Sequence, residues 1–260
     1  MKSRRLRYRF SSRAYAAQRQ AAGLSLLPTQ ISREFAQIGL YECCLMAGLS
    51  QPRVLRHQTG ISSQAVKSLA HAQDNVMSRH PYHNKAHIGQ VIIAAGLLAD
   101  KASLPQIDRD LLIIAALIHD FHHLGRLRCH EAFWQETKSF QAAIHHAVRH
   151  KMDVRLVSLF HQMIMATSMF SERQGASVKA NDILSLLLDA DLFASLFLPK
   201  KAVDRLTSSL KFEDRLTLPH TTLRDKFISH CQNRGLASLS AQQWHESLPA
   251  HQTYFRSYDG

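Results

Sequence analysis

The sequence lacks the cysteine spacing of a zinc ribbon or a disulfide framework, and it lacks an apolar run long enough to span a membrane. Its four cysteines, at positions 43, 44, 129 and 231, include no C-x-x-C pair, which indicates a reducing compartment and predicts buried, inert thiols. The unbroken apolar run from Leu111 to Ile118 is far too short to cross a bilayer. We therefore expect a cytoplasmic protein without a transmembrane segment, or an organelle-matrix protein in a eukaryote.

Acidic residues are also few, because 20 Asp and Glu stand against 32 Lys and Arg, a net charge of +12. This excess favours anionic partners such as phosphates, nucleic acid or an acidic membrane surface, or is simply a solvated basic surface. The first twenty residues hold seven Lys or Arg, no carboxylate and no apolar core of a secretory signal. We interpret residues 1–30 as a basic N-terminal extension: a transit peptide, an arm for nucleic acid or lipid, or a terminus without a specific partner.

Alternating strand patterns and internal repeats are missing as well, whereas apolar residues at helical spacing recur along the chain. With 45% hydrophobic and 20% charged residues, the composition is that of a globular protein. We predict an all-α fold in which residues 31–260 form one helical domain. The central helix is expected to carry the run from Leu111, with Asp108 as its N-cap and Gly125 as a residue that can end it. A first core helix is expected within 29–48, and Ser62 or Ser63 is expected to cap the next.

Metal-ligand residues occur in three places inside or at the end of apolar helical segments. His83 and His87 lie one helical turn apart, His119 and Asp120 end the central apolar run, and a third pair, Asp189 and Asp191, lies within LSLLLDADLF. A buried carboxylate or imidazolium without a partner costs several kcal/mol, so such groups need partners. Each group could be satisfied locally, but a shared divalent ion such as Zn, Mn, Mg or Fe would satisfy all three together. We predict a metal site.

The motifs that contain these residues resemble those of a known family. The order H…HD…D resembles the HD superfamily of metal-dependent phosphohydrolases, and HDFHHLG is similar to its H-D-x-x-H-x-G form. YHNKAH, from Tyr82 to His87, resembles the Y-H-N-x-x-H signature of class I cyclic-nucleotide phosphodiesterases, and DADL resembles the stretch with the last metal-binding Asp. These motifs span residues 82–192. The resemblance implies an HD-domain-like helical bundle with a metal site at its core.

The resemblance also implies a role for each matching residue. His87, His119, Asp120 and Asp191 would ligate the first metal, and His83 would be the general acid that protonates the leaving oxygen. His123 would help to hold a second metal or its bridging water. Glu136 is similar to an acidic residue that many HD proteins place behind the site, although it could equally be an exposed helix carboxylate. His122 is an additional histidine, which could be a solvated turn residue.

Three positions depart from the phosphodiesterase pattern. Ala142 stands where a glutamate supports the metal-bound hydroxide, Ser168 stands where an Asp is expected, and Arg224 replaces the purine-reading glutamine. An arginine suits a phosphate or an acidic substrate better than a purine. The departures weaken the expectation of cyclic-nucleotide specificity and leave the first metal set complete.

These observations predict a metal-dependent phosphohydrolase with one or two divalent ions. Its substrate would be a phosphorylated small molecule such as a nucleotide, either a phosphodiester or a monoester, attacked by a metal-activated water. The alternative is a catalytically degenerate HD domain that binds nucleotide or RNA as a regulator. A third possibility is an HD-type oxygenase with two irons, but no residue of the sequence specifically supports it.

Overall fold

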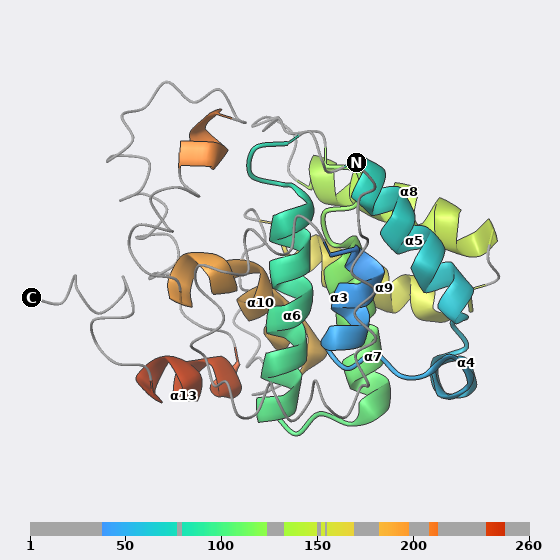
Figure 1. Cartoon of the computed structure of the whole chain (residues 1–260), viewed down its shortest axis with the longest axis horizontal. Coiled ribbons are helices and arrows are strands. Elements are labelled where there is room, and N and C mark those ends of the chain that lie inside the picture. The colour runs from blue at the N-terminus through green and yellow to red at the C-terminus, as the bar shows by residue number, and fades with distance from the viewer. Residues whose placement is uncertain are drawn as a thin grey trace, which may run out of the picture.

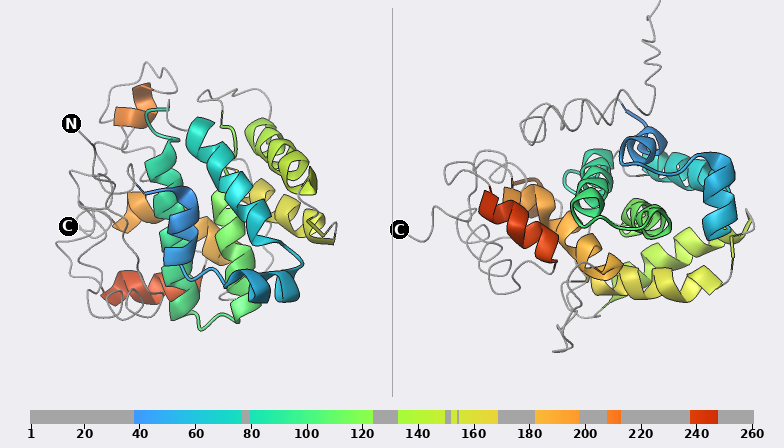
Figure 2. Two further views of the ribbon diagram at one scale, coloured as in Figure 1. Left: turned by 45° about the vertical axis from the view of Figure 1, so that its right-hand side comes forward. Right: turned by 90° about the horizontal axis from the view of Figure 1, so that it is seen from below.

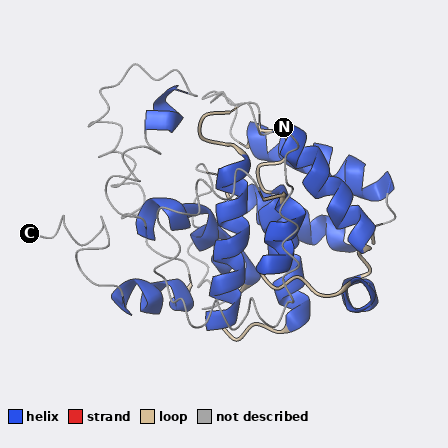
Figure 3. Cartoon of the chain, in the orientation of Figure 1, coloured by secondary structure: helices blue, strands red, loops and turns tan. Residues whose placement is uncertain are grey.

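A computed structural model describes residues 38–76, 80–123, 133–149, 152–153, 155–168, 182–197, 208–212 and 238–247. Within these residues every regular element is a helix and none is a strand (Figure 3). The prediction of an all-α fold is therefore confirmed for the described part of the chain. The basic extension, the boundary near residue 30 and Arg224 lie outside it.

The centre of the fold is a pair of helices, α6 (Lys85–Lys101) and α7 (Gln106–Ile118), joined by a short loop (Figure 1). Every residue of α7 from Asp110 to Ile118 is buried, which explains why its sequence is apolar on all sides. A third apolar helix, α10 (Ile183–Phe197), packs against both members of the pair. Seen from below, α7 lies inside a ring of helices to which α6 belongs (Figure 2).

The surrounding helices are amphipathic or short. The helix α3 (Leu40–Met46) packs against α6 and α5 (Ser63–Val76), while α4 (Pro52–Thr59) contacts α7. The helix α8 (Trp134–Arg149) packs against α9 (Arg155–Ala166) and α5, and α13 (Leu239–Ser247) packs against α10. No helix among the described residues combines the length and the apolar character that a membrane crossing requires.

Two expected helix ends differ from the structure. Asp108 is not the N-cap of α7, because that helix begins at Gln106 directly after Pro105 and leaves Asp108 in its first turn. A proline here fits, since its fixed φ leads the chain into a helix, and Asp108 still lies where a negative charge complements the helix dipole. The helix also ends at Ile118, well before Gly125, so the His-Asp pair lies in the turns that follow.

Other local predictions agree with the described residues. The Ser62 hydroxyl accepts a hydrogen bond from the Ala65 amide at 3.1 Å, so Ser62 caps α5. Of the helix expected within 29–48, the segment Leu40–Met46 is described and helical. Cys43 and Cys44 are buried and free, and burial raises the pKa of Cys43 to about 12. Both thiols are thus held protonated, as expected, whereas Cys129 and Cys231 lie outside the described residues.

Candidate metal centre

Three central helices bring the predicted metal ligands to one point. His87 lies in the first turn of α6, Asp191 lies on α10, and His119 and Asp120 follow the last residue of α7. The start of α6 is fixed by Asn84, whose side chain accepts hydrogen bonds from the amides of Ala86 and His87. The cap thereby sets where the His87 ring enters the core.

The ligand atoms form a compact cage. Nε2 of His87 lies 3.4 Å from Oδ2 of Asp120 and 3.4 Å from Oδ1 of Asp191. Nε2 of His119 lies 3.3 Å and 3.4 Å from the same two oxygens. A tetrahedron with metal–ligand bonds of about 2.0 Å has edges of about 3.3 Å, so these four of its six edges match a small divalent ion such as Zn.

One nitrogen of each imidazole makes no aligned hydrogen bond. Nε2 of both His87 and His119 is buried and has no aligned hydrogen bond, although the carboxylates are near. Nδ1 of His119 lies 2.8 Å from the Ala116 carbonyl oxygen, which selects the tautomer with a proton on Nδ1 and a lone pair on Nε2. These orphaned nitrogens, aimed at two carboxylates, fit a metal ion.

The charges of the four groups are strongly interdependent. Burial disfavours the charged imidazolium, but the adjacent carboxylates outweigh it and raise the pKa of His87 and, further, of His119. Conversely, burial opposes ionisation of Asp120 and Asp191, yet the neighbouring histidines hold both carboxyl pKa values below the ordinary range. A bound cation would take over the role of the two imidazolium protons.

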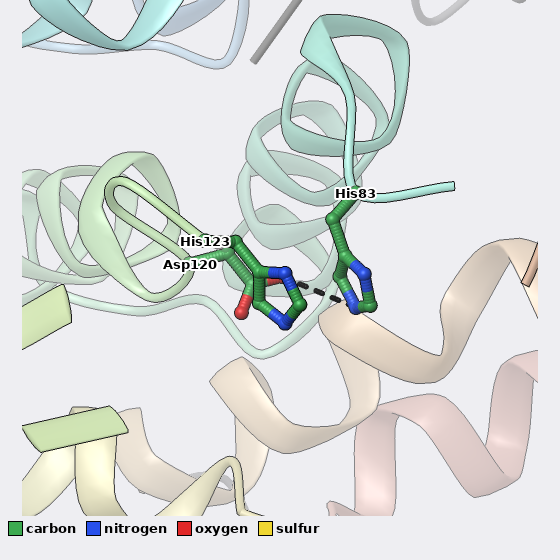
Figure 4. Close-up of side chains that lie close together, drawn as sticks. All are labelled: His83, Asp120 and His123. Carbon is green, nitrogen blue, oxygen red and sulfur yellow. Dashed lines mark ion pairs between the residues drawn. The ribbon is translucent and has the colours of Figure 1, made fainter. Parts of the chain in front are cut away.

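A second group of possible ligands includes Asp120 of this cage. His83, Asp120 and His123 offer ligand atoms that lie within 4.8 Å of one another (Figure 4). Nε2 of His83 is 3.9 Å from Oδ2 of Asp120, and the His83 and His123 rings stack with centroids 3.6 Å apart. His83 comes from the loop before α6 and is partly exposed, whereas His123 is buried. Two groups of His and Asp side chains within metal-binding distance therefore meet at Asp120.

Glu136 lies half-buried on α8 near the cage. Burial raises the pKa of its carboxyl, the contact with Ser168 opposes that rise, and the negative charges of Asp120 and Asp191 add to it. Ser168, which replaces the expected Asp, is fully buried. The reading of Glu136 as an exposed helix carboxylate is therefore wrong.

Asp189 has a different task from Asp191. Its carboxylate is buried and accepts hydrogen bonds from the backbone amide and the hydroxyl of Ser238, each at 2.6 Å. Ser238 in turn accepts from the Ala241 amide at the start of α13. Asp189 thus connects α10 to the start of α13 through hydrogen bonds, whereas the Asp191 carboxylate faces His87 and His119.

Several residues beside the cage are not among the predicted site residues. Tyr82 packs its ring 4.7 Å from His83 and 5.1 Å from His87, centroid to centroid. Asn84 sets the start of α6, and an Asn directly before an apolar helix is a recognisable cap signal. Gln73, on α5, binds the turn that carries Asp120, and nothing in its sequence context signals that contact.

Comparison with known proteins identifies no family for this chain. No protein-family model matches the chain, and no curated protein matches it either. An HD-type assignment therefore depends on the quoted motifs and on the arrangement of their residues, and it stays a proposal.

Proposed function

We propose that this protein is a metal-dependent phosphohydrolase of HD type. The observation that carries the proposal is the convergence of His87, His119, Asp120 and Asp191, with both Nε2 atoms buried and lacking aligned hydrogen bonds. Two imidazoles and two carboxylates are a ligand set suited to Zn, Mn or Fe, and a bound cation would offset the cost of burying the two carboxylates. The order of these residues along the chain agrees with the resemblance to the HD superfamily.

Different side chains of the site would bind the metal and transfer protons. The four residues of the cage would hold a divalent ion, which supplies a nucleophilic water near neutral pH and positive charge for phosphoryl oxygens. His83, partly exposed at the edge of the cage, would give a proton to a leaving oxygen. Glu136, with its raised pKa, would hold a proton near the site.

The test is a screen of the purified protein supplemented separately with Zn²⁺, Mn²⁺, Fe²⁺ and Mg²⁺. Bis(p-nitrophenyl) phosphate reports diester cleavage, p-nitrophenyl phosphate reports monoester cleavage, and a nucleotide panel including cyclic nucleotides addresses the substrate class. Activity should require a metal and should disappear together with bound metal in His119→Ala. A protein that binds none of these ions, or that binds them and cleaves nothing, contradicts the proposal.

One observation favours a second candidate, a regulatory domain that binds nucleotide or RNA without cleaving it. Ala142 offers no carboxylate at the position where the resemblance leads one to expect a glutamate, and Ser168 offers none where an Asp is expected. Metal binding with micromolar nucleotide affinity and no turnover in the same screen would support this alternative.

A further inference from the structure

The turn that follows α7 has a backbone conformation that needs support. His122 has φ +57°, in the left-handed region that residues with a Cβ rarely adopt. Two tight turns surround it, because the Phe121 amide donates to the Ile118 carbonyl and the His123 amide donates to the Asp120 carbonyl, both at 3.1 Å. The turn therefore determines in which directions the side chains of Asp120 and His123 leave the backbone.

The side chain of Gln73, on helix α5, forms hydrogen bonds with two backbone groups of this turn. Gln73, fully buried on α5, donates from Nε2 to the Asp120 carbonyl oxygen at 3.2 Å. Its Oε1 accepts from the His122 amide, also at 3.2 Å. A carboxamide places a neutral donor and a neutral acceptor side by side, and asparagine is one methylene shorter.

The core holds the middle of the same turn. Phe121 is buried, and its ring stacks on His122 with centroids 4.5 Å apart. Burial of Phe121 fixes where the turn lies, but a ring has no polar group with which to set the peptide orientations before and after it. Those two orientations are the ones that the Gln73 amide binds.

We propose that Gln73 is a positioning residue of the metal centre. It holds the Asp120 carbonyl and the His122 amide in the left-handed turn, so that the Asp120 carboxylate faces His87 and His119 while the His123 ring stacks on His83. The inference rests on the proposed metal centre. It adds a residue on α5, 47 positions before Asp120, that acts through the backbone and contacts no ion.

The test compares Co²⁺ binding by the full-length wild type and Gln73→Met, which is similar in length and makes neither hydrogen bond. Residues that orient metal ligands typically contribute about 10–100-fold to affinity, so Gln73→Met should bind Co²⁺ more weakly by that factor and show an altered visible spectrum. The matched control is Lys67→Met, which introduces the same side chain elsewhere on α5. The Lys67 ammonium lies 5.2 Å from the centre of the Tyr41 ring, just after the start of α3, and not against the turn. This control should keep the Co²⁺ affinity and spectrum of the wild type.

Wild-type affinity and spectrum in folded Gln73→Met would overturn the proposal. Should Gln73→Met fail to fold, Gln73→Asn keeps the amide but cannot span both groups, and it must show the same loss. If the wild type binds no Co²⁺, the proposed metal centre is wrong. Hydrogen exchange of the His122 amide then tests separately whether Gln73 stabilises the turn. Slow exchange in the wild type and fast exchange in the variant support the grip on the turn, and fast exchange in the wild type refutes it.

Discussion

At the scale of single residues, two carboxylates separated by one position have opposite surroundings. Successive residues of an α-helix are rotated by about 100°, so Asp189 and Asp191 point to different sides of α10. Asp191 faces His87 and His119, and Asp189 binds Ser238 at the start of α13. The two positions therefore offer the same chemical substitution with different expected outcomes.

Asp191→Asn should abolish tight metal binding, since it removes a charged ligand whose loss should cost more than the roughly 10–100-fold contributed by supporting residues. Asp189→Asn should keep the metal and lose stability, because hydrogen bonds to a charged group contribute about 1.5–3 kcal/mol. Metal content after dialysis and urea denaturation measure the two effects. Retention of the metal in Asp191→Asn would mean that Asp191 is not a ligand.

His83 has two possible roles, which its alanine variant separates. If His83 is the general acid, His83→Ala keeps its full metal content and turnover of a phosphoester falls about 10²–10⁴-fold. If His83 instead binds an ion together with Asp120 and His123, the variant loses one equivalent of metal. Elemental analysis beside the kinetic assay distinguishes these results. Unchanged metal content with wild-type turnover would remove both roles.

At the scale of elements, the beginning of α6 positions His87. Asn84→Ala removes the acceptor for the amides of Ala86 and His87, and loss of such a cap costs about 1 kcal/mol. Asn84→Asp keeps an acceptor for both amides but loses the hydrogen bond that Nδ2 of Asn84 donates to the Pro81 carbonyl oxygen at 2.8 Å, so it should lose less stability than Asn84→Ala. The midpoint temperature of thermal unfolding and the Zn²⁺ affinity should both fall in Asn84→Ala. Equal behaviour of the two variants would contradict the capping role.

The middle of α6 passes unusually close to the end of α3. A Cβ on Gly96 would lie 2.5 Å from the carbonyl oxygen of Ala47 and 2.8 Å from its Cα. Helix propensity alone predicts that Gly96→Ala stabilises the protein by about 1 kcal/mol. Because the clash is with backbone, which cannot rotate away, we expect a net destabilisation of about 1–3 kcal/mol. Urea denaturation decides, and a gain in stability would show that α3 can shift.

Sequence patterns predict these elements and their ligands better than they predict what orients them. The apolar run of α7 is a local signal that predicts the helix, and the motifs that resemble the HD superfamily imply the four residues of the cage. The prediction that Asp108 is the N-cap was wrong, because Pro105 is the N-cap and the helix begins at Gln106. Gln73 and Asp189 were beyond prediction, since their partners lie 47 and 49 positions away and depend on how α5 and α13 pack.

At the scale of the whole molecule, the positive charge is unevenly distributed. The chain carries a net charge of +12, yet Lys and Arg do not outnumber Asp and Glu among the described residues. The excess therefore belongs to the remaining segments, to which the first twenty residues contribute seven basic side chains and no acid. The helices around the candidate metal centre have no large positive surplus of their own with which to attract a polyanion.

Removal of residues 1–20 tests whether that charge and the chemistry are separate. The segment contains no metal-ligand pattern, so the truncated protein should keep its metal content and its turnover of a small phosphoester. If the extension binds nucleic acid or an anionic membrane, truncation should remove binding to an RNA oligonucleotide or to phosphatidylserine vesicles. Binding by the intact protein should then fall steeply with added salt, since counterion release supplies most of such an interaction. Loss of hydrolysis in a folded truncated protein would instead place the extension over the site and move the domain boundary toward the N-terminus.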